Sequence, residues 1–251
     1  MIKIIKNHEP AELIRYREKK PVEAWRPSYD EMGQVESGHY NPDGSPINLH
    51  DYVLDMLIKE QGGLCAYCMC SIPEIDRKTG VPRKATIEHI IPQSMTKKTD
   101  DWKMELTYSN FLAVCSGNIG RGNLCCDKAR KNIPLSLNPL DESSIRWIAY
   151  SNSGTIKADE MSALSKERID EINKELNDVL NLNEGKDLRK KRQSALTGMI
   201  QALQKSGDDK RLDVCKRKLN ILKGERVKKV EYVGILIYWL ERHIWKLESK
   251  M

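Results

Sequence analysis

The segment "ATIEHIIPQS" (85–94) places a carboxylate beside one of the five histidines of the chain, inside an otherwise apolar stretch. Its β-branched residues favour extended structure and Pro92 ends it, so the segment predicts a short β-strand. Successive side chains of a strand point to opposite faces, which would separate Glu88 from His89. Charged groups in an apolar strand are costly unless they are paired or bind a metal. The segment therefore predicts either a site for metal binding and proton transfer or a structural histidine beside a surface glutamate.

Cysteines flank this segment on both sides. Upstream, Cys65 and Cys68 form a C-x-x-C pair, and a tight turn can present both sulfurs of such a pair to one Zn²⁺ ion. Downstream, Cys115 and Cys126 are the candidates for the second pair, with Cys125 as an alternative for the last position. The arrangement predicts a closed structural zinc site of four thiolates; the alternative is a set of small buried apolar side chains.

Two further cysteines stand apart from these pairs. Cys70 is a spare thiol close to the first pair, and Cys215 shares a helical stripe with three leucines, which predicts a buried core position.

The bulk composition describes a polar globular chain. It has 251 residues, 31% of them charged, a net charge of +6 and a mean hydropathy of −0.59. This mild basic bias permits a nucleic-acid partner without requiring one. The N-terminal segment lacks the apolar core of a signal peptide, and the longest apolar run, "VGILIYWL" (233–240), is far short of the ~20 residues of a membrane helix. We therefore expect a cytoplasmic protein with no membrane partner, whose seven cysteines bind metal or stay reduced.

Periodicity and turn residues predict the remaining elements. Residues 26–48, rich in Pro, Gly, Asp and Asn, predict a long loop or arm, and 49–61 predict a helix that Gly62 and Gly63 end. Alternating apolar residues around an Asn-Ser-Gly turn predict a β-hairpin within 145–159. Helices dominate after residue 160, with three apolar stripes: Leu164, Ile169, Ile172, Leu176 and Val179; Leu212, Cys215, Leu219 and Leu222; and Val233, Leu236, Leu240, Ile244 and Leu247.

The order of the central motifs resembles the HNH nucleases. The matching stretches are "CAYC" (65–68), "IEHIIP" (87–92), "SNFLAVC" (109–115) and "CDKARK" (126–131). The resemblance implies a mainly α fold with a small α+β core, in which a zinc-stabilised, treble-clef-like ββα-metal unit precedes a helical C-terminal region. The expected parts are an N-terminal arm (1–48), a zinc-containing nuclease domain (49–140) and a hairpin plus helices (141–251).

The resemblance also implies a role for each matching residue. His89 would be the general base that takes a proton from water, and Asn110 would hydrogen-bond near it and hold the hairpin loop. Glu88 and Asp127 would bind the catalytic divalent ion, although the family pattern has a histidine where this chain has Asp127. Asn132, about one helical turn later, is an alternative for that position.

These residue types suit hydrolysis of a phosphodiester bond. Histidine titrates near pH ~6.5 and can act as a base, while a hard cation such as Mg²⁺ or Mn²⁺ between two carboxylates stabilises the developing charge. Zinc with four thiolates has no open position, so it would be structural. Arg130 and Lys131 could contact a flanking phosphate. The expected activity is metal-dependent endonuclease activity, with DNA favoured over RNA as the substrate.

A wider set of motifs is similar to the PtuB family, the HNH component of Septu-type antiphage defence, which also accompanies certain retrons. These motifs are "IKIIK" at the N-terminus, "QGGLCAYC", "LNPLD" and "LNLN" in the helical tail. The resemblance implies an ATPase partner of the PtuA type and cleavage of nucleic acid during phage infection. The alternative is a non-catalytic, zinc-stabilised module that binds nucleic acid or protein, with His89 structural.

The C-terminal region offers two candidate surfaces. The basic runs "KDLRKKR" (186–192) and "KGERVKK" (223–229) predict solvated helix faces; the alternative is a surface that follows a phosphate backbone. The aromatic residues of the last helix predict core or a protein contact: Tyr232, Tyr238, Trp239 and Trp245. An ATPase partner would contact the N-terminal arm or this tail.

Overall fold

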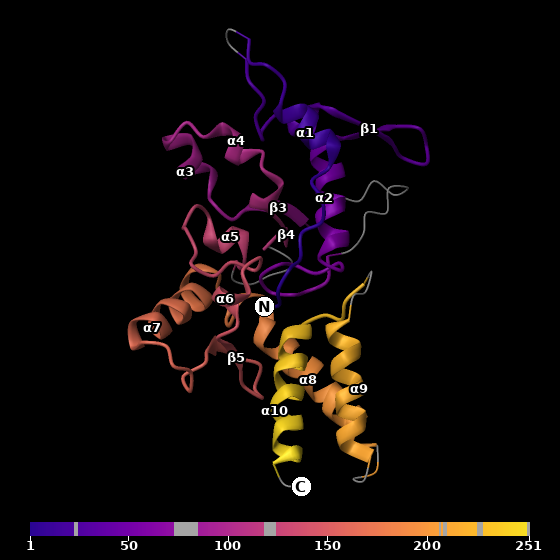
Figure 1. Cartoon of the computed structure of the whole chain (residues 1–251), viewed down its shortest axis with the longest axis vertical. Helices are drawn as coiled ribbons and strands as arrows, with labels where there is room; N and C mark the ends of the chain where they lie inside the picture. Colours follow the sequence, from indigo (N-terminus) through magenta and orange to yellow (C-terminus); the bar gives the residue numbers. More distant parts are fainter. Residues whose placement is uncertain are drawn as a thin grey trace.

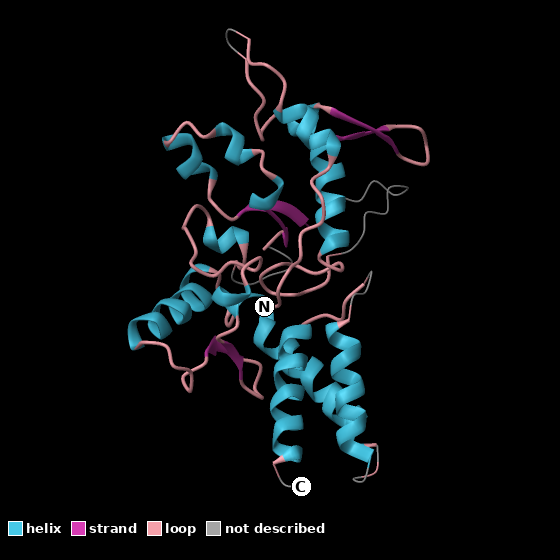
Figure 2. Cartoon of the chain, viewed as in Figure 1, coloured by secondary structure: helices cyan, strands magenta, loops and turns pink. Residues whose placement is uncertain are grey.

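A computed structural model describes residues 1–22, 25–72, 85–117, 124–205, 207, 210–224 and 228–249 (Figure 1). Part of the basic run 223–229 therefore lies outside the described residues. The chain is mainly helical with three small antiparallel sheets in the described residues (Figure 2), which agrees with the expected fold class at that level. None of the described helices has the length and apolar character needed to cross a membrane.

Helix α2 (Leu49–Glu60) leads the chain into the cysteine region, as predicted. The side chain of Asn48 caps its first turn by accepting a hydrogen bond from the Asp51 amide (2.8 Å). At the other end Gly62 and Gly63 both have positive φ, the conformation that ends a helix most readily at glycine. The buried face of α2 consists of Leu49, Val53, Leu54, Leu57 and Ile58.

The prediction of a loop for 26–48 is wrong in part, because this segment contains a hairpin. After α1 (Ala11–Arg17) and a short 3-10 turn (Met32–Gln34), β1 (Glu36–Tyr40) pairs with β2 (Pro46–Asn48). The strands are short and largely exposed, so they have no apolar alternation to reveal them. The Asp43-Gly44 dipeptide in the turn, with Gly44 at φ +85°, is the signal that could have revealed the hairpin.

The central hairpin consists of β3 (Ala85–His89) and β4 (Phe111–Cys115), paired antiparallel with His89 opposite Phe111. The predicted strand thus exists, although it ends before Pro92. Three short helices lie between the strands and a fourth follows them: α3 (Gln93–Lys98), α4 (Trp102–Glu105), a 3-10 turn (Tyr108–Asn110) and α5 (Asp127–Arg130). All of β4 is buried, and Gln61 at the end of α2 exchanges two hydrogen bonds with the Ala113 backbone (2.7 and 2.8 Å).

The second half of the chain is a hairpin followed by long helices. The predicted hairpin is confirmed as β5 (Ile148–Tyr150) and β6 (Ile156–Ala158), preceded by α6 (Glu142–Ile145). Helix α7 (Lys166–Lys174) runs into a π-helical turn (Glu175–Val179), and a 3-10 turn (Gly185–Asp187) leads to α8. The last three helices pack on one another in the lower part of Figure 1: α8 (Leu188–Gln204), α9 (Arg211–Lys223) and α10 (Val233–Glu248).

The basic run 186–192 does not form a uniformly solvated face. Arg192 is 1% exposed and donates to the carbonyl oxygens of Gly154 (2.6 Å) and Leu182 (2.8 Å) and to Asn183 Oδ1 (3.0 Å). It therefore joins the β5–β6 turn to the start of α8, while Lys190 and Lys191 remain exposed. Cys215 is fully buried on α9, as predicted.

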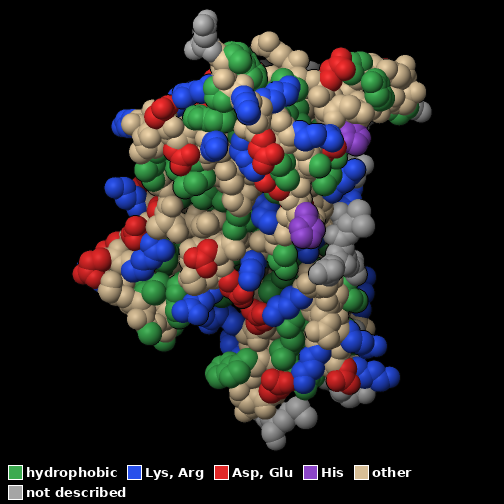
Figure 3. All heavy atoms as spheres, turned by 45° about the horizontal axis from the view of Figure 1, so that its top comes forward, with side chains coloured by type: hydrophobic (Ala, Val, Ile, Leu, Met, Phe, Trp, Pro, Cys, Tyr) green, Lys and Arg blue, Asp and Glu red, His purple; other side chains and the backbone are tan. Residues whose placement is uncertain are grey.

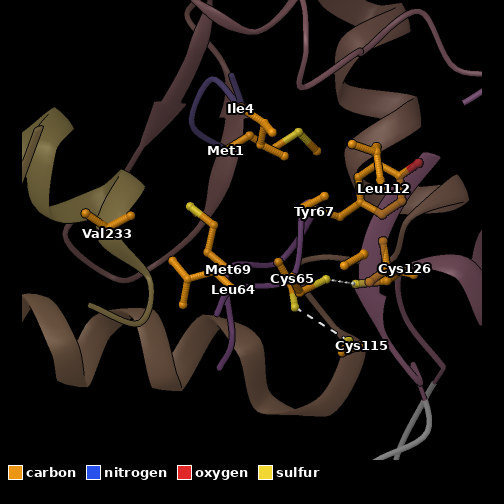
Figure 4. Packing of buried hydrophobic residues seen from close by; sticks show 14 of the residues in the cluster. Met1, Ile4, Leu64, Cys65, Tyr67, Met69, Leu112, Cys115, Cys126 and Val233 are labelled. Atoms are coloured by element: carbon orange, nitrogen blue, oxygen red, sulfur yellow. Dashed lines mark hydrogen bonds between the residues drawn. The ribbon is translucent and has the colours of Figure 1, made fainter. Parts of the chain in front are cut away.

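One continuous cluster of buried side chains runs through both halves of the chain. Figure 4 shows part of this cluster, which includes Met1, Ile4, Tyr67 and Met69. The residues of the expected N-terminal arm, the cysteine region and the C-terminal helices all contribute to this cluster. The cysteine region is consequently enclosed by packing from both ends of the sequence.

Candidate metal centre and adjoining acid–histidine site

Four buried cysteines lie close enough together to hold a metal such as zinc. The sulfur atoms of Cys65, Cys68, Cys115 and Cys126 all lie within 4.8 Å of one another. Cys65 Sγ is 3.8 Å from Cys126 Sγ, and Cys68 Sγ is 3.8 Å from Cys115 Sγ. A tetrahedron with Zn–S bonds of ~2.3 Å has edges of ~3.8 Å, so the spacing suits this ion. The set matches the predicted ligands.

Three elements bring these thiols together. Cys65 and Cys68 lie in the turn after α2, where the Met69 amide donates to the Cys65 carbonyl (3.0 Å). Cys115 is the last residue of β4 and Cys126 directly precedes α5. Figure 4 shows the side chains of Cys65, Cys115 and Cys126 converging from these segments. A metal ion there would tie the end of α2 to the hairpin and to α5.

Cys126, and not its neighbour Cys125, completes the set. The backbone of Cys126 has φ 55° and ψ −136°, a conformation that non-glycine residues adopt rarely and at a cost. That conformation places its thiol among the other three, while Cys125 is buried beside Cys115. Hydrogen bonding with Cys125, together with Cys126, Cys65 and Cys68, lowers the pKa of the Cys115 thiol well below its usual range. A thiolate is the form that binds metal.

The two predicted carboxylates, Glu88 and Asp127, influence each other electrostatically. Glu88 on β3 is 5% exposed, and burial raises its pKa to about 8, against the opposing effect of Arg130. The Asp127 carboxyl group, at the first position of α5, adds to this rise. Asn132, the alternative to Asp127, is exposed and lies beyond the end of α5. The pair Glu88 and Asp127 could share a proton or a cation.

The prediction that Arg130 contacts a flanking phosphate is wrong. Its side chain is 1% exposed, and its guanidinium group points into the protein. Its partners are the carbonyl oxygens of Ile133 (2.8 Å), His89 (2.7 Å) and Ile90 (2.7 Å), the Tyr67 hydroxyl (3.1 Å) and the Glu88 carboxylate. The Tyr67 hydroxyl also donates to Glu88 (3.2 Å). Arg130 therefore balances the charge of Glu88 and holds the end of β3. Lys131 is exposed, and its contact with a phosphate stays a prediction.

His89 lies in an aromatic environment and is 6% exposed. Its ring packs edge-on against Tyr29 (centroids 4.5 Å apart) and Phe111 (5.0 Å). Nε2 lies 3.0 Å from the Glu105 carbonyl oxygen, and because a carbonyl only accepts, Nε2 carries the proton and Nδ1 is the basic nitrogen. Burial lowers the pKa of His89 to about 4, so the ring is neutral near pH ~7. A neutral ring of fixed tautomer can accept a proton at Nδ1.

The charge of Asp127 acts on both His89 and Glu88. The Asp127 carboxylate raises the pKa of His89 in opposition to burial, and it raises the pKa of Glu88 as well. Glu88 and His89 are successive residues of β3, whose side chains point to opposite faces, yet the charge of Asp127 acts on both. The three groups therefore form one electrostatic cluster at the junction of β3 and α5.

Asn110 holds the chain that leaves β3. Its Oδ1 accepts from the Ile91 amide (2.7 Å), and its Nδ2 donates to the carbonyl oxygens of Ile91 (3.3 Å) and Met104 (3.2 Å). The structure thus contains the loop contacts expected of Asn110, two residues beyond His89. The catalytic role assigned to Asn110 stays a prediction.

Three residues near the site were not predicted: Tyr29, Tyr67 and Glu105. Tyr29 comes from the segment expected to be a loop, and Glu105 contributes only its backbone carbonyl, so neither has a local sequence signal. Tyr67 lies between the first two cysteines and is 1% exposed.

The comparisons add no relative. No protein-family model matches the chain, and no curated protein matches it.

Proposed function

We propose that the chain is a metal-dependent endonuclease of the HNH type, which hydrolyses phosphodiester bonds in nucleic acid, with DNA favoured over RNA. One observation supports the proposal: Asp127 directly follows Cys126, one of four thiols with the spacing of a zinc site, and its charge acts on both Glu88 and His89 at the end of β3. A carboxylate pair beside a neutral histidine is the minimum set for hydrolysis assisted by a hard cation.

Each residue has a distinct task in this proposal. The four thiolates would hold zinc, which would fix α5 against the hairpin and take no part in the reaction. Glu88 and Asp127 would hold Mg²⁺ or Mn²⁺, which would supply positive charge for the developing negative charge on the phosphate. His89 accepts a proton from the attacking water at Nδ1, since the Glu105 carbonyl holds Nε2–H.

The motif similarity to the PtuB family supports a role as the nuclease of an antiphage defence system with a PtuA-type ATPase partner. Of the two expected contact regions, the tail is favoured by Trp245, which is 67% exposed on α10. The start of the N-terminal arm is disfavoured because Met1 and Ile4 are buried. Co-purification of an ATPase with the wild-type chain, and its loss with Trp245→Ala, would test this assignment.

The nuclease proposal is tested by cleavage assays with the zinc-loaded protein on plasmid DNA, single-stranded DNA, RNA and tRNA, with Mg²⁺ or Mn²⁺. The His89→Ala variant should keep its zinc and lose activity by roughly 10²-fold or more, the usual range for a general base. His8→Ala changes an exposed histidine and serves as the matched control. Equal cleavage by His89→Ala and the wild type would reject the assignment of the base.

A second candidate function is a non-catalytic, zinc-stabilised binding module. It is favoured by the 6% exposure of His89 and by the pairing of Glu88 with Arg130, both of which suit structural roles. It predicts nucleic-acid or protein binding without cleavage in any of the assays above. In that case Glu88→Gln and Asp127→Asn should change stability while leaving binding intact.

A further inference from the structure

A fifth thiol adjoins the metal centre. Cys70 Sγ lies 3.3 Å from Cys68 Sγ, although Cys70 is not one of the four cysteines whose sulfurs all lie within 4.8 Å of one another. Met69 between them has φ +60°, a left-handed conformation that turns the chain sharply. This turn is held by hydrogen bonds from Cys65 N to Cys70 O (2.9 Å) and from Tyr232 N to Met69 O (2.9 Å). The two thiols are therefore kept in contact.

Cys70 is also the most accessible thiol of the group. The four clustered cysteines are at most 1% exposed, whereas Cys70 is only half-buried. Cys70 lines a cavity of about 890 Å³ between the cysteine turn and the starts of α8 and α10. Other residues lining it are Ser71, Lys190, Lys191, Ser194 and Tyr232. A small water-borne reagent can thus reach Cys70 before it can reach any of the four clustered cysteines.

We propose that Cys70 is an oxidation site through which hydrogen peroxide removes Cys68 from the metal. The Cys70 thiol loses its proton, the thiolate attacks one peroxide oxygen and the O–O bond breaks; Cys70 becomes a sulfenic acid, and the hydroxide that leaves takes up the proton as water. The Cys68 thiolate then attacks the Cys70 sulfur and displaces hydroxide, which forms a Cys68–Cys70 disulfide. Together the two cysteines lose two electrons, and one hydrogen peroxide molecule is reduced to one water and one hydroxide ion.

The geometry suits this disulfide over other pairs. The two sulfurs need to approach by roughly one ångström to reach the S–S bond length of ~2.05 Å. Cys125 and Cys215 are each fully buried, so peroxide has no comparable route to them. Loss of Cys68 leaves three thiolates, and a site with three ligands holds zinc less tightly than the closed site. The proposal concerns the metal centre and is independent of nuclease activity.

The experiment uses the full zinc-loaded chain treated with hydrogen peroxide. Zinc release is followed by the absorbance of a chelating dye, and the tryptic peptide 60–77, which holds Cys65, Cys68 and Cys70, is sequenced by mass spectrometry after alkylation. The wild type should release zinc together with formation of a Cys68–Cys70 disulfide, and a thiol reductant with added zinc should reverse both. Cys70→Ser should slow the release roughly five-fold or more, whereas Cys215→Ser should behave as the wild type.

Two results would overturn the proposal. One is zinc release from Cys70→Ser at the wild-type rate. The other is a peptide in which peroxide links Cys65 to Cys68, or leaves Cys70 as an unmodified thiol while zinc is lost. The second measurement uses the wild-type protein alone, so it decides the question even if Cys70→Ser folds poorly.

Discussion

Arg130 shows how a charged side chain in a basic segment can become structural. It lies in "KARK" (128–131), yet its guanidinium group is buried and bonded to Glu88, Tyr67 and the backbone that leaves β3. Removing one partner of a buried ion pair leaves the other charge unbalanced, which costs far more than the pair itself contributes. The buried guanidinium group of Arg130 thus lowers the free-energy cost of placing Glu88 in the interior.

We expect Arg130→Met to lower the free energy of unfolding by about 3–5 kcal/mol, because Glu88, the Tyr67 hydroxyl and three buried carbonyl oxygens would lose their donor. Lys128→Met, an exposed position on the same helix, should change it by less than about 0.5 kcal/mol. Urea denaturation of the zinc-loaded proteins measures both. Equal stability of the two variants would show that Arg130 does not balance Glu88.

His89 should make stability depend on pH. Burial lowers its pKa from 6.5 to about 4, so between these pH values the unfolded chain binds a proton that the folded protein does not. The contribution of His89 to the free energy of unfolding should therefore fall as the pH falls through this window, by up to about 1.4 kcal/mol per pH unit. His89→Gln should lose less stability than the wild type over the same range, in urea titrations between about pH 7 and pH 4.5. Parallel curves for the two proteins would mean that the ring titrates normally in the folded state.

At the scale of elements, the β5–β6 hairpin docks on α8 through a glycine. Gly154 has φ +83°, and a Cβ atom there would lie 2.0 Å from the Arg189 carbonyl oxygen and 2.9 Å from the Gln193 amide nitrogen. Gly198, further along α8, has nothing within 4 Å of its Cβ position. The two glycines thus form a matched pair with opposite expected effects.

We expect Gly154→Ala to destabilise the protein by about 1–3 kcal/mol, because both the backbone conformation and the contact with α8 must change. Gly198→Ala should stabilise it by up to about 1 kcal/mol through helix propensity. Thermal or urea unfolding of the two variants compares them directly. A neutral Gly154→Ala would show that the hairpin is not held against α8.

The metal centre should stabilise specific elements. The Cys126 amide donates to the Leu180 carbonyl (2.9 Å), and Asn181 Nδ2 donates to the Leu124 carbonyl (2.7 Å), so α5 is tied to the turn after the π-helical segment. Cys126→Ser or removal of zinc should increase amide hydrogen exchange by roughly 10-fold or more in β3, β4 and that turn. The far ends of α8 and α10 should change less. Unchanged protection in β4 without zinc would contradict this, and Cys215→Ser is the control.

Local patterns predicted the elements that have local causes. The 3.6-residue stripes of α2, α9 and α10, the turn of β5–β6 and the spacing of the cysteines were all visible in short windows of sequence. The sequence indicated helix α8 only through its basic run and not through an apolar stripe. The β1–β2 hairpin was not predicted because its strands lack apolar alternation. The inward direction of Arg130 and the aromatic contact of Tyr29 with His89 arise from residues distant in sequence, which no short window contains.

At the scale of the whole molecule, positive charge is concentrated in one part of the chain. Residues 185–251 contain 18 Lys and Arg against 8 Asp and Glu, a net charge of +10, whereas residues 1–184 contain 24 against 28, a net charge of −4. Figure 3 shows many Lys and Arg side chains on the lower part of the molecule, where the C-terminal helices lie. If nucleic acid is the substrate, this region should contact its phosphates.

We expect the double variant Lys190→Gln with Lys191→Gln to weaken nucleic-acid binding and to reduce the slope of log affinity against log salt by about 1–2, because fewer counterions would be released. Lys166→Gln with Lys174→Gln on α7 removes the same charge from exposed positions and is the control. Fluorescence anisotropy at several salt concentrations gives both slopes. The same slope for both double variants would exclude the start of α8 from the interface.

Because Glu88 is paired with Arg130, a nucleic-acid strand would bind before a catalytic cation does. Arg130 already satisfies the carboxylate, and burial favours its protonated form, so Mg²⁺ alone would gain little by entering. The phosphate oxygens of a bound strand would bring the missing negative charge. We therefore expect ion occupancy to be conditional on the strand, which would leave the protein inert in a magnesium-rich cell until a nucleic acid lies across it.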